Sequence, residues 1–195
     1  MGALQDIGTL LVQTFFHLYI LAILLRLLLQ MAKGDFYNPI SQFLIKATQP
    51  LLTPARRLVP SVGGIDTASI VVVLLLQITA TILLVTIRGY PIPNATALLI
   101  WGALGTFGMV INIYFMAILA AIILSWIAPS SYNPTVILLH QLTEPVMKPF
   151  RRILPAMGGL DLSPIFVFIT INILQIILSH LAAATGLPVD YVIGI

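Results

Sequence analysis

Two stretches of this sequence match each other and decide its fold: residues 38–66 read NPISQFLIKATQPLLTPARRLVPSVGGID, and residues 133–161 read NPTVILLHQLTEPVMKPFRRILPAMGGLD. At a constant offset of 95 residues, 12 of the 29 aligned positions are identical. They include the initial Asn-Pro, the Arg-Arg pair, the Gly-Gly and the final Asp. These residues either have special backbone conformations or carry a charge. The repeat therefore predicts one local structure that is built twice in the chain.

The composition assigns the chain to the integral membrane proteins. Of its 195 residues, 59% are hydrophobic and 8% are charged, whereas about 25% of the residues are charged in a soluble domain. We therefore expect an all-α membrane protein. The sequence contains no cysteine, which excludes disulfides and thiolate metal sites. We expect no nucleic-acid binding, because no basic surface domain studded with aromatic residues is present to support it.

The apolar runs predict four transmembrane helices, over residues 7–31, 68–87, 107–127 and 162–184. Each run is long enough to cross a hydrocarbon core of about 30 Å as a helix. The third apolar region begins earlier, at residue 95, and is too long for one span and too short for two. We expect residues 95–106 to form a separate interfacial or re-entrant piece, with Gly102, Gly105 and Gly108 at its junction with the third span.

The repeat extends into the flanking spans, so each unit consists of a span, a loop and a second span. The first unit covers residues 1–94 and the second covers residues 107–195. Because two spans return the chain to its starting side, the two units are predicted to have the same orientation. Basic residues cluster in the two loops, whereas Arg88 alone lies in the link between the units. The positive-inside rule then places both loops in the cytoplasm and both termini outside.

Each repeated loop has a pattern that predicts its local structure. Asn-Pro supplies an N-cap and a first helical residue, and apolar residues then recur as in an amphipathic helix of the headgroup region. Two prolines one turn apart are expected to bend or end that helix. Gly-Gly permits a left-handed turn, after which Asp can cap the next span and pair with an arginine. These structural roles are predicted for Asn38, Pro39, Pro50, Pro54, Pro60, Gly63, Gly64 and Asp66, and for Asn133, Pro134, Glu144, Pro145, Pro149, Pro155, Gly158, Gly159 and Asp161.

The paired arginines are the best functional candidates in the repeated loops. They lie where lipid phosphates are the nearest anions, and guanidinium groups bind phosphate bidentately. The candidates for lipid or partner binding are Arg56, Arg57, Arg151, Arg152, Lys46 and Lys148. We consider anionic lipid headgroups, a membrane-protein partner and a second copy of the chain as their partners. A simpler interpretation, in which these residues only fix the topology, is also open.

Polar residues are sparse within the predicted spans, and none is an aspartate or a glutamate. Gln77, Asn172, Gln175 and Ser179 are predicted to make hydrogen bonds between helices, and the alternative is that they line a path for potassium or an osmolyte. Arg26 lies about one turn from the cytoplasmic end of its span and is expected to extend toward the membrane surface. No set of residues suggests catalysis, so we expect no enzymatic activity, no metal site and no cofactor.

The second copy carries a specific spacing of Pro, Arg, Gly and Asp. The residues of this pattern are Thr143, Glu144, Pro145, Pro149, Arg151, Arg152, Pro155, Gly158, Gly159, Asp161, Leu162, Ser163 and Pro164. The pattern resembles that of the YggT/YlmG family of bacterial and plastid membrane proteins, and the resemblance covers essentially the whole chain. The two copies differ in places: the first has Arg26, Gln30, Met31 and Gln49, where the second has Ala121, Ser125, Trp126 and Glu144.

The resemblance implies an envelope protein without established catalytic activity, which we expect in the bacterial inner membrane. Family members have been associated with osmotic-stress tolerance and potassium uptake, with cell division or nucleoid organisation and, in plastids, with covalent haem attachment to a cytochrome. These roles are easiest to reconcile in a small scaffold or assembly factor that acts on lipids and partner proteins. We therefore expect a scaffold that supports envelope integrity under osmotic stress, with an oligomeric channel or transport accessory as the alternative.

Overall fold

The computed structural model describes residues 2–127, 132–153, 161–187 and 191–195, and all the regular secondary structure in these ranges is helical. Its helices are α1 (Ala3–Met31), α2 (Pro39–Leu58), α3 (Thr67–Ile87), α4 (Ala95–Ile127), α5 (Pro134–Ile153) and α6 (Ser163–Ala184). Four of them, α1, α3, α4 and α6, are long and apolar enough to cross a membrane. This architecture confirms the predicted fold class, an all-α protein with four membrane-spanning helices.

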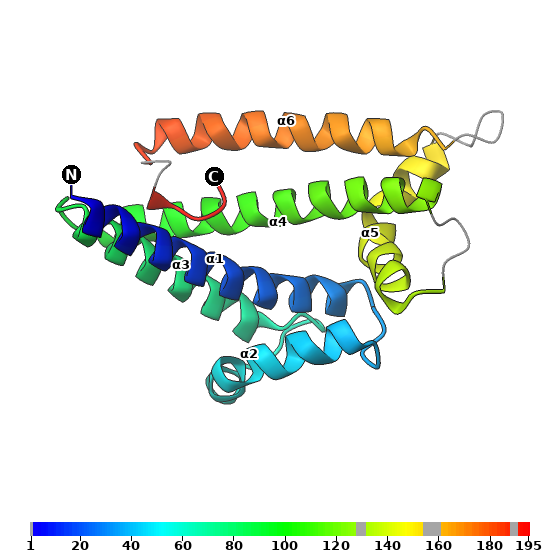
Figure 1. The fold of residues 1–195 in the computed structure, drawn as a ribbon, viewed down its shortest axis with the longest axis horizontal. Coiled ribbons are helices and arrows are strands. Elements are labelled where there is room, and N and C mark those ends of the chain that lie inside the picture. The colour runs from blue at the N-terminus through cyan, green and yellow to red at the C-terminus, as the bar shows by residue number, and fades with distance from the viewer. Residues whose placement is uncertain (1, 128–131, 154–160, 188–190) are drawn as a thin grey trace.

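The helices form two successive triplets with the same order and direction. In Figure 1, α1 and α4 both run away from the end that holds the N-terminus, and α3 and α6 both run back toward it. Within the triplets, α1 packs on α3 and α4 packs on α6, while α3 and α4 join one triplet to the other. The repeated segments α2 and α5 connect the spans of their own triplets.

Helix α4 differs from the sequence-based expectation of two pieces. It is one continuous helix, and the predicted break at the three glycines is absent. Gly105 and Gly108 instead give room to residues 191–195, which fold back against α4: a Cβ on Gly105 would lie 2.8 Å from the carbonyl oxygen of Ile193, and one on Gly108 would overlap the carbonyl of Gly194. Glycine is therefore required here for a close approach of two backbones.

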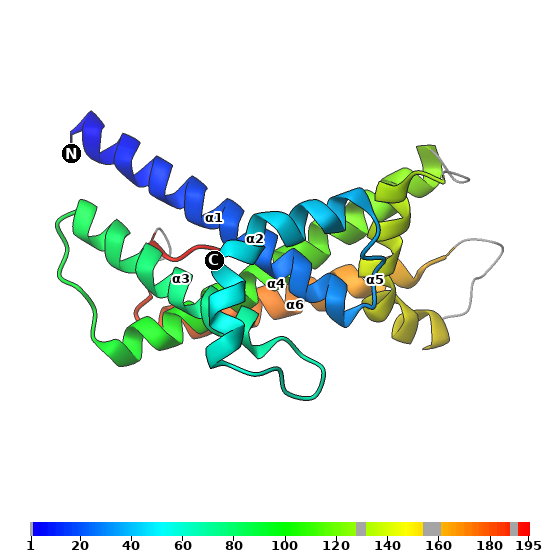
Figure 2. The ribbon, with the colours of Figure 1, turned by 90° about the horizontal axis from the view of Figure 1, so that it is seen from below.

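Helices α2 and α5 both continue through their internal prolines. Pro50 and Pro54 lie inside α2, and Pro145 and Pro149 lie inside α5. In Figure 2, α2 changes direction along its length, so that its last turns run at a steep angle to its first turns. A proline removes a backbone donor and clashes with the preceding turn, which accounts for this kink.

The buried face of each repeated helix packs against the spans. In the first triplet, Leu44 and Leu52 of α2 join the main core, which includes Ile20, Ile23 and Val73. In the second, Met147 of α5 packs with residues such as Ile118 of α4 and Val167 of α6. The apolar contacts of each repeated helix thus hold its arginines close to the ends of the spans.

The two repeated segments also touch each other. The side-chain Oδ1 of Asn38 caps α2 by accepting from the amide of Ile40 at 3.0 Å, and its Nδ2 donates to the carbonyl oxygen of Pro134 at 2.6 Å. Close by, the amide of Asp35 donates to Oε1 of Gln141 at 2.9 Å. The N-terminal ends of α2 and α5 are therefore joined, and both segments lie on the same side of the bundle.

Candidate functional site

Arg56 and Asp66 form an ion pair at the end of α2 in the first triplet, in which the carboxylate is buried and the guanidinium group is 39% exposed. Nε of Arg56 donates to Oδ2 of Asp66 at 3.1 Å, and its Nη2 donates to the same oxygen. Ser69 donates its hydroxyl to Oδ2 at 2.7 Å and its amide to Oδ1 at 3.4 Å, so Asp66 is the N-cap of α3. Burial raises the pKa of Asp66, but the hydrogen bonds from Arg56 and Ser69 outweigh burial and hold the pKa below its ordinary value.

Arg26 is a second guanidinium group beside this pair. It lies in α1 and does not extend away from the protein: it is 8% exposed, and its Nη1 donates to the hydroxyl of Thr48 in α2 at 2.7 Å. That hydroxyl donates in turn to the carbonyl oxygen of Leu44 at 2.7 Å, which fixes its orientation. The repeated threonine thus positions a charged side chain of the preceding span.

These groups line one cavity of about 480 Å³ between α1, α2 and the turn into α3. Its charged members are Arg26, Arg56 and Asp66, and Gln30 adds an amide. The apolar wall of the cavity is formed by Phe36, Ile45 and Val59. Two guanidinium groups against one carboxylate leave the cavity with a formal charge of +1.

The equivalent cluster of side chains in the second triplet has the opposite charge. Nε of Arg151 donates to Oδ2 of Asp161 at 3.0 Å, and Nη1 donates to Oε2 of Glu144 at 2.6 Å. Ala121 stands where the first triplet has Arg26, and both residues line their cavities. Glu144 lies outside the cavity that Arg151 and Asp161 line, so the formal charge of −1 belongs to the cluster of one guanidinium group and two carboxylates. Burial raises the pKa of Asp161, but hydrogen bonds from Ser163 and Arg151 lower it below its ordinary value.

The other residues of the predicted site are scattered. Arg57, Arg152, Lys46 and Lys148 are exposed, and none of them lines the Arg26 cavity. In the first Gly-Gly turn, Gly63 and Gly64 have φ values of 60° and 80°, as the left-handed turn requires. The predictions for Pro155, Gly158 and Gly159 lie outside the described residues.

Sequence reasoning missed the link between Arg26 and Thr48. A signal was available, because threonine is identical in the two copies at positions 48 and 143. Each of these threonines hydrogen bonds to the carbonyl four residues earlier. Only the first has an arginine within reach, since Ala121 replaces Arg26 in the second triplet.

The polar residues of the spans do not line a common path within the chain. Gln77 is fully buried, and its Nε2 donates to the carbonyl oxygen of Ile193 at 2.9 Å. Asn172 and Ser179 are exposed on α6 and donate to carbonyls of their own helix. Gln175 donates to Oδ1 of Asn112 at 3.1 Å, which joins α6 to α4 as predicted for interhelical hydrogen bonds.

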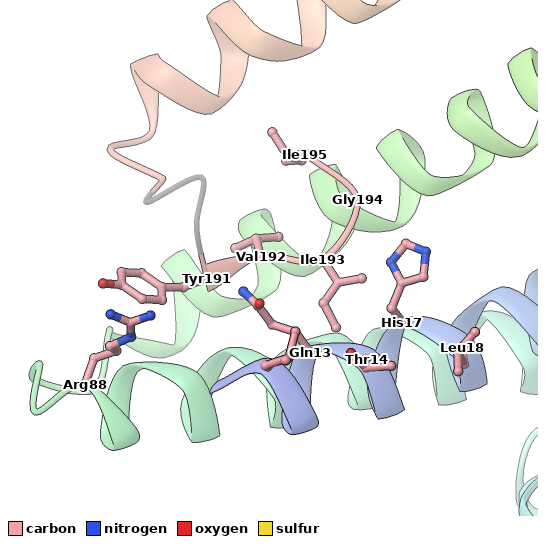
Figure 3. Close-up of a pocket in the computed structure, with 11 residues that line it drawn as sticks. Gln13, Thr14, His17, Leu18, Arg88, Tyr191, Val192, Ile193, Gly194 and Ile195 are labelled. Atoms are coloured by element: carbon pink, nitrogen blue, oxygen red, sulfur yellow. The ribbon is translucent and has the colours of Figure 1, made fainter. Parts of the chain in front are cut away.

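A separate cavity of about 630 Å³ lies beside the C-terminal residues. Figure 3 shows Gln13, His17 and other residues of α1 on one side of it and the chain from Tyr191 to Ile195 on the other. Arg88 borders this cavity and pairs with Asp6, with 3.3 Å between Nη1 and Oδ1. Residues 191–195 therefore lie between α1 and α4, with this cavity beside them.

The four spans and the two helix triplets define a multi-pass α-helical membrane protein built from a tandem repeat. The chain belongs to the CCB3/YggT family, whose model matches residues 6–87 and again residues 100–182. The two matched segments correspond to the two triplets.

Relatives are found in several bacteria and in a plant. The chain is 44% identical over 178 residues to the uncharacterized protein PA0392 of Pseudomonas aeruginosa, covering 90% of each chain. It is 39% identical over 179 residues to the uncharacterized protein YggT of Escherichia coli K12, covering 91% of this chain and 92% of the other. A shorter match, 39% identical over 65 residues, covers 32% of this chain and 24% of the chloroplastic YlmG homolog protein 2 of Arabidopsis thaliana. No solved structure matches the chain.

Proposed function

We propose that this protein is a non-enzymatic scaffold or assembly factor of the bacterial inner membrane that binds anionic lipid at the cytoplasmic face. By this binding it supports the integrity of the envelope under osmotic stress. One observation carries the proposal: two arginines, one of them buried, line a cavity to which the described part of the chain contributes one carboxylate. A cavity with excess positive charge beside the headgroup layer suits the phosphate of a lipid.

The lengths of the spans support a location at headgroup depth. Helix α1 has 29 residues and is about 44 Å long at 1.5 Å per residue, whereas the hydrocarbon core is about 30 Å thick. In this proposal the excess length lies at the end of α1 next to α2, so that the last turns of α1, which hold Arg26, reach the headgroup layer. Helix α2 carries exposed Phe43 and Ile40 next to exposed Lys46, as expected for an amphipathic helix in the headgroup region.

The chemistry of the cavity favours binding over catalysis. Its polar groups are two guanidinium groups, an amide, a serine hydroxyl and a carboxylate. Asp66 already accepts from Arg56 and Ser69, so it is not available as a general base. Guanidinium and amide N–H groups are donors that suit an anion.

The charge distribution gives the orientation that we propose. The cytoplasmic side holds α2 and α5 with their basic residues, and the opposite side holds Arg88, paired with Asp6. With this orientation, the arginines face the leaflet surface that carries negative potential.

The function is tested by changing the four paired arginines together. Replacement of Arg56, Arg57, Arg151 and Arg152 by Gln should leave membrane insertion intact, abolish rescue of an osmotic-shock phenotype and lower the amount of phosphatidylglycerol that copurifies with the protein. The matched control replaces the same four residues by Lys, which keeps the charge and loses the bidentate geometry.

Equal rescue by the wild type and the correctly inserted Gln variant would overturn the proposed function. Full rescue and full lipid recovery with the Lys variant would reduce the arginines to topological anchors. Specific lipid binding predicts intermediate recovery for the Lys variant.

A further inference from the structure

We infer that the first triplet holds one phosphate group between Arg26 and Arg56, and that the second triplet fills the equivalent place with its own carboxylate, that of Glu144. The inference deepens the proposed function and rests on it in taking a lipid phosphodiester as the source of the phosphate. It makes the two repeats functionally unequal: one binds an external anion, and the other carries an internal substitute.

The two equivalent arginines differ in how many donors they use. Both Arg56 and Arg151 direct Nε to the aspartate that precedes the next span. Arg151 also gives Nη1 to Glu144 at 2.6 Å. Among the described residues, Nη1 of Arg56 has no protein acceptor, because the position equivalent to Glu144 is the neutral Gln49. The second triplet thus marks where an anion belongs in the first.

The buried Arg26 strengthens this assignment. A guanidinium group has five N–H donors, and in the part of the chain that the structure describes Arg26 uses one of them, on Thr48. It is 8% exposed and lines the same cavity as Arg56. A buried charge is expensive without a counter-ion. Among the described residues, Asp66 is the one carboxylate that lines this cavity, and it is already held by Arg56 and Ser69.

The differences between the repeats are mutually consistent. Where the first triplet has Arg26 and Gln49, the second has Ala121 and Glu144. The site that carries the additional arginine lacks the carboxylate, and the site that carries the carboxylate lacks the additional arginine. The formal charges of +1 and −1 follow directly from these two exchanges.

A lipid phosphodiester fits the shape and charge of the first site. Its single negative charge matches the formal charge of +1, and its oxygens can accept from Arg26, Arg56 and the amide of Gln30. Phe36 and Ile45 form an apolar wall against which the glycerol and the first methylenes of the lipid can lie. Arg57 is exposed and does not line this cavity, so we assign it to general attraction by the membrane surface.

The test introduces into the first site a carboxylate at the position equivalent to Glu144. Gln49 is exposed, so Gln49→Glu should fold normally and pair with Arg56 as Glu144 pairs with Arg151. We expect at least a tenfold weaker affinity for phosphatidylglycerol, measured by native mass spectrometry of the full-length protein titrated with this lipid in detergent. Gln49→Ala, which adds no charge, should stay within twofold of the wild type.

A complementary variant is designed to gain a lipid-binding site in the second triplet. Ala121→Arg combined with Glu144→Gln rebuilds the first site in the second triplet, and the number of tightly bound phosphatidylglycerol molecules should rise from one to two per chain. Unchanged affinity in Gln49→Glu, or unchanged stoichiometry in a folded double variant, would overturn the inference.

A competition experiment separates the site from the proposed function. If inorganic phosphate binds to the wild type and is lost in Gln49→Glu, while phosphatidylglycerol and phosphatidylcholine bind equally to both, the phosphate site stands and the lipid function fails. If phosphatidylglycerol alone is lost, both stand. If neither ligand responds to Gln49→Glu, the site does not exist.

Discussion

Asp66 and Asp161 occupy the same position in the two repeats and have different surroundings. The side chain of Asp66 is 6% exposed, and that of Asp161 is 41% exposed. Asp66 both caps α3 and neutralises Arg56. Asp161 accepts from the amide of Ser163 at 2.9 Å and shares Arg151 with Glu144. Only the first aspartate is the N-cap of its span as predicted, because the N-cap of α6 is Leu162 and makes no side-chain hydrogen bond. Only the first aspartate also supplies a buried carboxylate to its ion pair.

Protonation of Asp66 should destabilise the protein in acid. Since folding lowers the pKa of Asp66 from its ordinary value of 3.8, the carboxylate contributes stability above that value, and the contribution is lost as the pH falls through the lower pKa of the folded state. Asp66→Asn keeps a capping side chain and removes the charge, so it should cost about 2 kcal/mol at pH 6 and flatten the acid dependence. Thermal unfolding in detergent between pH 6 and pH 3 measures both effects.

The control for this prediction is Asp161→Asn, whose more exposed ion pair should contribute less. A variant Asp66→Asn that loses stability in acid as steeply as the wild type would contradict the assignment.

At the scale of elements, the features that could be predicted best from the sequence are those that depend on residues adjacent along the chain. The spans follow from apolar runs, the start of α2 follows from Asn38 and Pro39, and the cap of α3 follows from Asp66. The prediction of a break in α4 was wrong because Gly105 and Gly108 contact residues that lie more than 80 positions later in the chain. No local pattern distinguishes a glycine that breaks a helix from one that admits another backbone.

The site was predicted only in part for the same reason. Arg56 was found because it lies within ten residues of its partner Asp66. Arg26 was expected to reach the surface, since its partner Thr48 lies on a different helix. Hydropathy places an arginine near the end of a span, and only the packing of α2 on α1 decides whether that arginine is exposed or enclosed.

The packing of residues 191–195 on α4 gives a prediction about two glycines of one helix. Gly108→Ala would place a Cβ onto the carbonyl of Gly194, whereas in Gly102→Ala the nearest atoms lie at an ordinary 3.6 Å. We expect Gly108→Ala to destabilise the protein by about 1–3 kcal/mol and Gly102→Ala to have little effect. Thermal unfolding in detergent measures this difference.

A labelling experiment locates the cause of that loss. The chain has no cysteine, so Val192→Cys introduces a single thiol at a buried position. Maleimide should label it slowly in the wild-type background and faster with Gly108→Ala. Equal labelling rates would contradict displacement of residues 191–195.

At the scale of the whole molecule, fusion of the two repeats in one chain permits their divergence. The repeats share direction and helix order, and they meet through α3 and α4 and through the hydrogen bond from Asn38 to Pro134. Two identical copies would have to keep identical cavities. A tandem repeat can instead carry Arg26 with Gln49 in one half and Ala121 with Glu144 in the other.

The residues that fold back between the repeats also give the molecule an internal optical reporter. Trp101 is 8% exposed and packs with Leu187 and Val192, whereas Trp126 is 82% exposed. Trp126→Phe would leave Trp101 as the only indole, and brominated lipids should quench its fluorescence weakly. Combining Trp126→Phe with Gly108→Ala should increase that quenching, and combining it with Gly102→Ala should not. The fluorescence of this one side chain would then report whether residues 191–195 stay packed on α4. The measurement needs no attached dye and can be made in a native bilayer.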